Sequence, residues 1–131
     1  MSAVREFLAS RGISLPEGGP DDSPETETVH GLANRKNQAL RGRLEHHGIN
    51  AFDGARLYLE LARDARLHCA VVSGSTHTRS LLEHARLGTL IDECVDGNAA
   101  LAQGLRRKPE PDMLLAACRS LAVEPGRAAV F

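Results

Sequence analysis

A hydroxyl-rich turn contains the residues of this sequence that are best suited to chemistry. Ser73, Gly74 and Ser75 follow a short apolar run at residues 69–72, and an apolar pattern at helical spacing resumes after them. Such a run closed by a turn predicts a β-strand buried on both faces, and ligands bind at the carboxyl ends of strands in open α/β sheets. Hydroxyls, backbone N–H groups and a helix N-terminus suit an anion, with phosphate the best match. The alternative is a plain strand-to-helix turn, capped by Ser75 or Thr76, without a ligand.

Lysine is rare in this chain, and its two lysines are therefore informative. The 16 basic residues comprise 14 arginines and only Lys36 and Lys108, so arginine is the usual basic residue of the surface. A lysine ammonium is a compact charge on a flexible stem and contacts a phosphate or carboxylate as a point charge. The alternative is an ordinary solvated side chain, on a helix surface for Lys36 and before a Pro-x-Pro turn for Lys108.

Composition argues against several classes of protein. The 131 residues suit one domain or part of one. With 16 basic and 17 acidic residues, the chain lacks the basic excess of a nucleic-acid-binding protein. No apolar run could cross a bilayer and no signal-peptide pattern opens the chain, so we expect no membrane partner. Cys69, Cys94 and Cys118 are odd in number and widely spaced, which predicts reduced thiols in a cytoplasmic protein. Without a CxxC or HxxxH pair, no zinc site is expected.

Helical and strand patterns alternate along the second half of the chain. Strands that alternate with helices predict parallel βαβ units and therefore an α/β fold. We expect a helical segment at residues 1–50 and an α/β part at residues 51–131, with a hinge at residues 52–54. The expected helices are at residues 2–11, 25–32, 33–47, 54–65, 76–86 and 99–104, with another after residue 107; the expected strands are at residues 69–72, 91–95 and 128–131.

Three stretches of the sequence resemble the haloacid dehalogenase superfamily, and within it the β-phosphoglucomutase-like hydrolases and mutases. Residues 71–75 (VVSGS) are similar to the second of the family's four motifs, a Ser or Thr at the end of a strand. Residues 108–112 (KPEPD) are similar to the third, a lysine that often precedes Pro-x-Pro-Asp. Residues 34–37 (NRKN) resemble the part of the family's helical cap whose lysine faces the substrate. The resemblance implies a partial Rossmann-like parallel sheet with a helical cap segment.

The resemblance also implies a chemistry. Members of this family transfer phosphoryl groups of a sugar phosphate or similar phosphate ester through an aspartyl-phosphate. By this resemblance Ser73 and Lys108 are the catalytic residues: Ser73 donates a hydrogen bond to the transferring group, and Lys108 neutralises its charge. The substrate-binding residues that it implies are Lys36, Asn37, Gly74, Ser75 and His77. His77 departs from the family pattern, because many relatives carry Asn there.

Two of the four family motifs have no counterpart in this sequence. The nucleophile is an Asp of a DxD motif on a strand that precedes the cap, and no Asp of residues 1–19 follows a hydrophobic run. The fourth motif, an acidic pair that helps to hold Mg²⁺, follows the strand that residues 128–131 begin. We therefore expect the middle of such an enzyme, inactive alone, without ligands for Mg²⁺ and prone to self-association through exposed strand edges. The alternative is an inactive remnant that at most binds phosphate or a partner.

Overall fold

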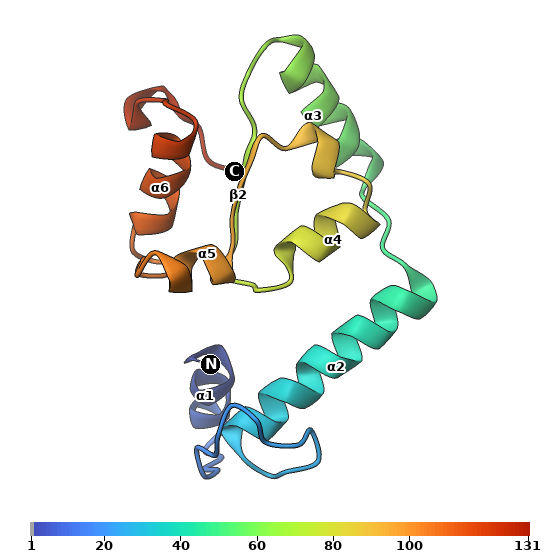
Figure 1. Ribbon diagram of the computed structural model, residues 1–131, viewed down its shortest axis with the longest axis vertical. Helices are drawn as coiled ribbons and strands as arrows, with labels where there is room; N and C mark the ends of the chain where they lie inside the picture. Colours follow the sequence, from blue (N-terminus) through green and yellow to red (C-terminus); the bar gives the residue numbers. More distant parts are fainter. Residues whose placement is uncertain (1) are drawn as a thin grey trace. The chain divides into compact units, whose positions relative to one another are not determined.

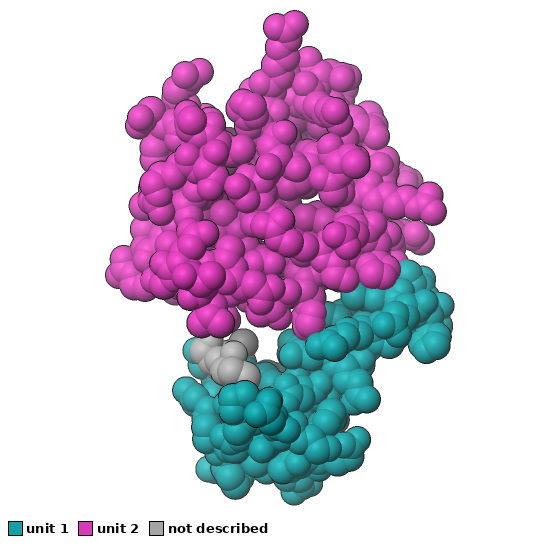
Figure 2. All heavy atoms as spheres, viewed as in Figure 1, with its two compact units in different colours: residues 1–48 teal, residues 49–131 magenta. Residues whose placement is uncertain are grey.

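The computed structural model describes residues 2–131, with side chains from Val4 onward (Figure 1). The chain divides into two compact units, Met1–Gly48 and Ile49–Phe131 (Figure 2). Asp53 and Gly54, expected in a hinge, instead form the first turn of a helix. The assignment of residues 1–50 to a helical domain and of residues 51–131 to an α/β domain stays a prediction.

Unit 1 consists of two helices joined by a loop. Helix α1 is Ser2–Ser10 and helix α2 is Val29–His47. Thr28 caps α2, because its Oγ1 accepts a hydrogen bond from the Gly31 amide at 2.9 Å. The separate helix expected at residues 25–32 is wrong: the residues before Thr28 form turns and bends, and one continuous helix follows the cap. Among residues 2–131, no helix is long and apolar enough to cross a membrane, including α2 with its 19 residues.

Unit 2 is built on a parallel sheet of two strands. Strand β1 is Ala70–Val72 and strand β2 is Glu93–Val95, with Val72 paired to Val95. The predicted α/β class with a parallel sheet is thus confirmed. A parallel pair requires a crossover connection. Here it consists of helix α4 (Thr78–His84) and the 3₁₀ helix η1 (Gly88–Leu90).

The core of unit 2 lies between the sheet and helix α6 (Asp112–Ser120). Figure 1 shows α6 on one side of the strands and α4 on the other. Met113 of α6 is fully buried, and it packs with Val95 and Ala100. The remaining elements of unit 2 are helix α3 (Asp53–Asp64), helix α5 (Gly97–Ala102) and the 3₁₀ helix η2 (Pro125–Arg127).

Two expectations about strands are wrong. Strand β1 is not buried on both faces, because Ala70 is exposed while Val71 and Val72 are half-buried. Only one edge of β1, the edge that pairs with β2, has a strand partner within residues 2–131. Residues 128–131 are exposed and form no strand. A strand needs a neighbouring strand to bond its N–H and C=O groups.

Candidate functional site

The turn after β1 is held together by its own two serine hydroxyls. The Ser75 amide donates to Ser73 Oγ at 3.2 Å, and the His77 amide donates to Ser75 Oγ at 3.1 Å. Because each hydroxyl oxygen accepts an amide proton, its own proton remains available for a further acceptor. The expected capping by Ser75 or Thr76 is wrong: α4 begins at Thr78 with His77 before it and without a side-chain cap. The Ser75 hydroxyl closes the turn instead.

Two backbone amides of this turn have no protein acceptor. Within the described chain, neither the Gly74 nor the Thr76 amide donates a hydrogen bond. A Cβ built on Gly74 meets no atom within 4 Å, so space is open beside this residue. Unpaired amides, an oriented serine hydroxyl and open space together provide donors for an anion.

Lys108 reaches the same end of the sheet. Its Nζ lies 3.4 Å from the carbonyl oxygen of Val72, the residue before Ser73. This is a long hydrogen bond, and an ammonium group carries three protons, so protons remain for an anion. The structure thus places Lys108 at the carboxyl end of β1, beside the residue that precedes Ser73. The catalytic roles of Ser73 and Lys108 stay predictions.

An ion pair closes the loop that carries Lys108. Arg106 Nε and Nη2 each donate to the Asp112 carboxylate at 2.9 Å, and the Arg106 amide donates to the same carboxylate at 3.1 Å. These side-chain hydrogen bonds from Arg106 lower the pKa of Asp112, and the carboxylate in turn raises the pKa of Arg106. Two parallel bonds to one carboxylate fix a geometry more firmly than a single contact. The pair therefore brackets residues 107–111, a role that the sequence analysis did not foresee.

A second turn, after β2, contacts the turn after β1. The Gly97 amide donates to the Ser75 carbonyl at 2.9 Å, and Asn98 Nδ2 donates to the Thr76 carbonyl at 2.9 Å. Asp96 opens this turn and is only 2% exposed. Its Oδ1 accepts two backbone amides of the first turn of α5, at 3.0 and 2.9 Å. Residue types alone assigned no role to these residues; the available signal was an Asp-Gly-Asn turn directly after a strand.

The described residues do not fit Mg²⁺. Across residues 2–131, no group of three His, Cys, Asp or Glu side chains is placed to hold a metal. Asp96 follows β2, but its Oδ1 is taken by amides, and its Oδ2 lies 3.9 Å from Arg79 Nε without a hydrogen bond. Mg²⁺ is usually bound by carboxylates with several waters. Ligands for it would have to come from other residues than these.

Two of the three cysteines are poor candidates for a nucleophile. Cys69, Cys94 and Cys118 are free thiols in the structure. Burial raises the pKa of both Cys69 and Cys94. Nearby carboxylates add to the rise, and Arg79 partly opposes it at Cys94. A thiol with a raised pKa forms less of the reactive thiolate at neutral pH. These two side chains are therefore poorly suited to attack a substrate.

The positions of the other predicted substrate-binding residues say less about a bound ligand. His77 Nε2 is buried and has no hydrogen-bond partner among the described residues. Lys36 and Asn37 lie on α2 in unit 1, Lys36 exposed and Asn37 half-buried. Their neighbours Asn34 and Arg35 bond to carbonyls of residues 20–24 and so attach α2 to its loop. The substrate contacts of Lys36, Asn37 and His77 stay predictions.

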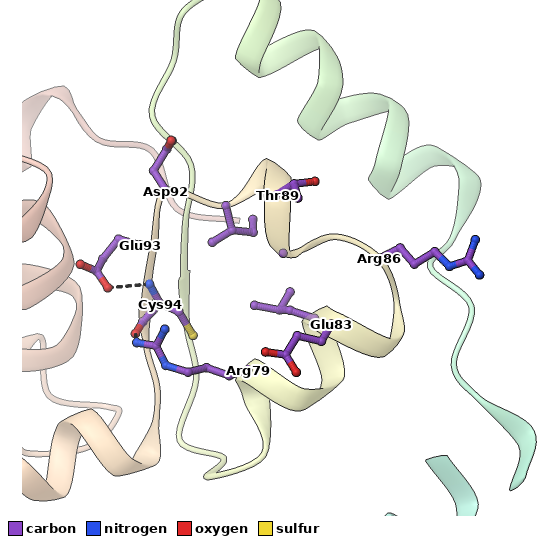
Figure 3. A pocket seen from close by; sticks show the side chains of 10 residues that line it. Arg79, Glu83, Arg86, Thr89, Asp92, Glu93 and Cys94 are labelled. Atoms are coloured by element: carbon purple, nitrogen blue, oxygen red, sulfur yellow. Dashed lines mark hydrogen bonds between the residues drawn. The ribbon is translucent and has the colours of Figure 1, made fainter. Parts of the chain in front are cut away.

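An open pocket of about 560 Å³ lies between α4, η1 and β2 (Figure 3). Arg79 extends toward β2, where its Nη2 donates to the Cys94 carbonyl at 2.9 Å, while Arg86 points away from the strand. Basic and acidic side chains both line this pocket, so it favours neither sign of ligand charge. None of the predicted site residues lines it, and it is not the candidate site.

Comparison with known proteins finds relatives that match nearly the whole chain. No protein-family model matches the chain. Over 128 residues, or 98% of its length, the chain is 45% identical to proteins named β-phosphoglucomutase from Mycobacterium tuberculosis and Mycobacterium bovis, and covers 49% of each. It is 29% identical over 128 residues to a protein of Mycobacterium tuberculosis named uncharacterized glycosyl hydrolase, of which it covers 10%. The chain thus spans about half the length of the β-phosphoglucomutases it matches. This identity, over a segment that includes both the VVSGS and the KPEPD motifs, confirms the resemblance of the chain to β-phosphoglucomutase-like members of the haloacid dehalogenase superfamily.

Proposed function

We propose that the protein binds the phosphate group of a phosphate ester between the Ser73 turn and Lys108, and that it takes part in phosphoryl transfer. The observation that carries the proposal is the 3.4 Å approach of Lys108 Nζ to the Val72 carbonyl. Because Val72 directly precedes Ser73, this approach places an ammonium group at the strand end that carries the Ser73 hydroxyl. A cation and a hydroxyl donor at one strand end suit a phosphate dianion, because hydrogen bonds to a charged acceptor are stronger than neutral ones.

Every group offered by this site is a donor, and a phosphate dianion is an acceptor. One lone pair of the Ser73 hydroxyl is engaged by the Ser75 amide at 3.2 Å, and its proton is free to be donated to an anion. The Gly74 and Thr76 amides add donors, and Lys108 adds a positive charge. Donors that are in place before reaction stabilise charge as it develops on the transferring oxygens. This supports roles for Ser73 and Lys108 in catalysis as well as in binding.

We assign the nucleophile to a carboxylate outside these 131 residues. Ser73 is poorly activated, because the Ser75 amide is the partner of its hydroxyl and no general base of the described residues bonds to it. Asp96 and Asp112 are engaged by backbone amides and by Arg106, respectively. The relatives named β-phosphoglucomutase support a sugar phosphate as the ester. The family resemblance implies an aspartyl-phosphate as the intermediate. Lys36 and Asn37 are proposed to contact the rest of such a substrate.

The alternative is a chain that binds phosphate without catalysing its transfer. It is favoured by the lack of a metal-binding acidic group in the described part of the chain. Both candidate functions require the same phosphate site. They differ in whether a longer form of the protein, with the length of its relatives, turns over a sugar phosphate.

The shared site is tested by titrating the ¹⁵N-labelled chain with inorganic phosphate and following its amide resonances. We expect the Gly74 and Thr76 amides to shift, with a dissociation constant on the order of millimolar. Lys108→Ala and Ser73→Ala should each weaken binding by about tenfold, because each removes a donor to a charged group. The control is Arg119→Ala, which removes an exposed cation at the far end of α6 and should change little. Equal affinity in all four proteins would overturn the site.

A further inference from the structure

The peptide between Ser75 and Thr76 is fixed from two directions. The Gly97 amide donates to the Ser75 carbonyl at 2.9 Å, and Thr78 Oγ1 donates to the same oxygen at 3.0 Å. The next carbonyl, that of Thr76, accepts Asn98 Nδ2 at 2.9 Å. Two successive carbonyls of the turn after β1 are therefore bound by the turn after β2.

Gly97 lies too close to the first turn for any side chain. A Cβ at this position would lie 2.7 Å from the Gly74 carbonyl oxygen and 3.1 Å from the Thr76 nitrogen. Both are backbone atoms, so they cannot move aside as the end of a flexible side chain would. The position of Gly97 is itself fixed, because the buried Asp96 carboxylate accepts the amides of Asn98 and Ala99.

The geometry of a peptide group links these contacts to the candidate site. A peptide unit is planar and trans, so its C=O and N–H point in opposite directions. Since the Ser75 carbonyl points toward Gly97, the Thr76 N–H of the same unit points away from the turn after β2. That N–H is one of the two amides of this turn without an acceptor in the described chain. The contact thus sets the direction of a donor.

We infer that Gly97 and Asn98 are positioning residues, which hold the Thr76 amide in the direction in which it binds phosphate. This inference rests on the proposed phosphate site and adds residues that support the site without contacting the ligand. The direct contacts come from Ser73, Lys108 and the amides of the first turn. Gly97 and Asn98 act only through that turn.

The test uses three variants of the full chain, Gly97→Ala, Asn98→Ala and the control Gly88→Ala, with inorganic phosphate as the probe. A Cβ at Gly88 meets no atom within 4 Å, so the control adds the same methyl group without displacing backbone. We expect Gly97→Ala to weaken phosphate binding by more than about tenfold and Asn98→Ala by about threefold. Gly88→Ala should match the unaltered chain.

Two further readouts separate positioning from general stability. In Asn98→Ala, whose replaced side chain is exposed, the urea midpoint should stay unchanged while the response of the Thr76 amide to phosphate becomes smaller. The Gly74 amide should still respond. If Gly97→Ala fails to fold, Asn98→Ala decides the question alone. If Asn98→Ala keeps both the affinity and the Thr76 response of the unaltered chain, the inference is overturned and the proposed site stays intact. Absence of phosphate binding in the unaltered chain would instead overturn the proposed function.

Discussion

Lys108 Nζ lies 3.4 Å from the carbonyl oxygen of Val72, although the two residues are 36 positions apart in the sequence. Helix α6 makes this approach possible, because it begins directly after the Lys108 loop and packs on both strands. Its Met113 is fully buried near the start of the helix. The position of the lysine therefore depends on the packing of α6 and on the ion pair that closes the loop.

Removal of that ion pair should loosen Lys108. In Arg106→Ala we expect phosphate affinity to fall by about threefold to tenfold. The loop loses the two side-chain hydrogen bonds from Arg106 to Asp112 and keeps the one from the backbone amide. The pKa of Asp112, which these bonds lower, should rise toward its ordinary value of 3.8. An NMR titration of the Asp112 carboxyl carbon measures this shift. Arg119→Ala is the control and should leave the titration unchanged.

The same pair predicts a pH dependence of stability with a definite sign. The folded-state pKa of Asp112 lies below its unfolded value, so its contribution to stability is complete above the unfolded pKa and is lost as pH falls through the folded pKa. The free energy of unfolding should therefore fall less steeply below about pH 4 in Arg106→Ala than in the unaltered chain. Equal slopes for the two proteins would contradict the pairing.

The core around Met113 should dominate the stability of unit 2. Met113 is 0% exposed, whereas Leu115 on the same helix is 36% exposed. Met113→Ala should lower the free energy of unfolding by about 2–5 kcal/mol, because it leaves a cavity in a close-packed core. Leu115→Ala is the matched control and should cost less than about 1 kcal/mol. Urea denaturation measures both values, and similar losses would show that α6 does not pack on the sheet as described.

The sequence was sufficient to predict which residues lie at the carboxyl end of β1. A short apolar run before Ser73 predicts a strand, and the rarity of lysine singles out Lys108. Both signals are local, and both depend on residue type. The side chain of Lys36 was equally conspicuous, but a helix surface residue does not reveal what it will contact.

The rest of the site depends on contacts between distant segments. The closeness of Gly97 to the Gly74 carbonyl results from the way two turns meet, and the residues of one turn do not encode it locally. Similarly, Arg106 and Asp112 flank a loop with two prolines whose shape sets their distance. The strand expected at residues 128–131 failed for a related reason, because strand pairing requires a neighbour.

Self-association is expected from exposed edges and apolar side chains in unit 2. Within residues 2–131, β1 pairs along one edge only, and α3 exposes Leu57, Tyr58 and Leu61 by 54–57% each. Unpaired strand edges and apolar patches favour association with other chains. Sedimentation velocity should show oligomers that increase with concentration, and Leu57→Lys combined with Leu61→Lys should reduce them. Glu60→Gln on the same helix is the control. A monomer that melts sharply at high concentration would contradict this prediction.

The 131-residue chain alone should show no phosphatase or phosphoglucomutase turnover. Ser73 and Lys108 can bind and polarise a phosphoryl group, but neither replaces a carboxylate nucleophile. The two acids that could substitute are engaged, Asp96 as the cap of α5 and Asp112 as the partner of Arg106. When members of a catalytic unit are absent, only residual rate from binding remains.

The assay uses sugar phosphates and a chromogenic phosphate ester, with and without Mg²⁺, and Lys108→Ala as the control. Metal-dependent turnover that disappears in Lys108→Ala would show that one of these acids acts as the nucleophile, and the assignment of the nucleophile to other residues would be wrong. A longer form of the protein, extended at both ends to the length of its relatives, provides the complementary measurement. If that form turns over a sugar phosphate and loses activity with Lys108→Ala, the catalytic proposal holds. If it binds phosphate but shows no turnover, the non-catalytic alternative is correct, because the donors would then be present without a group to attack phosphorus.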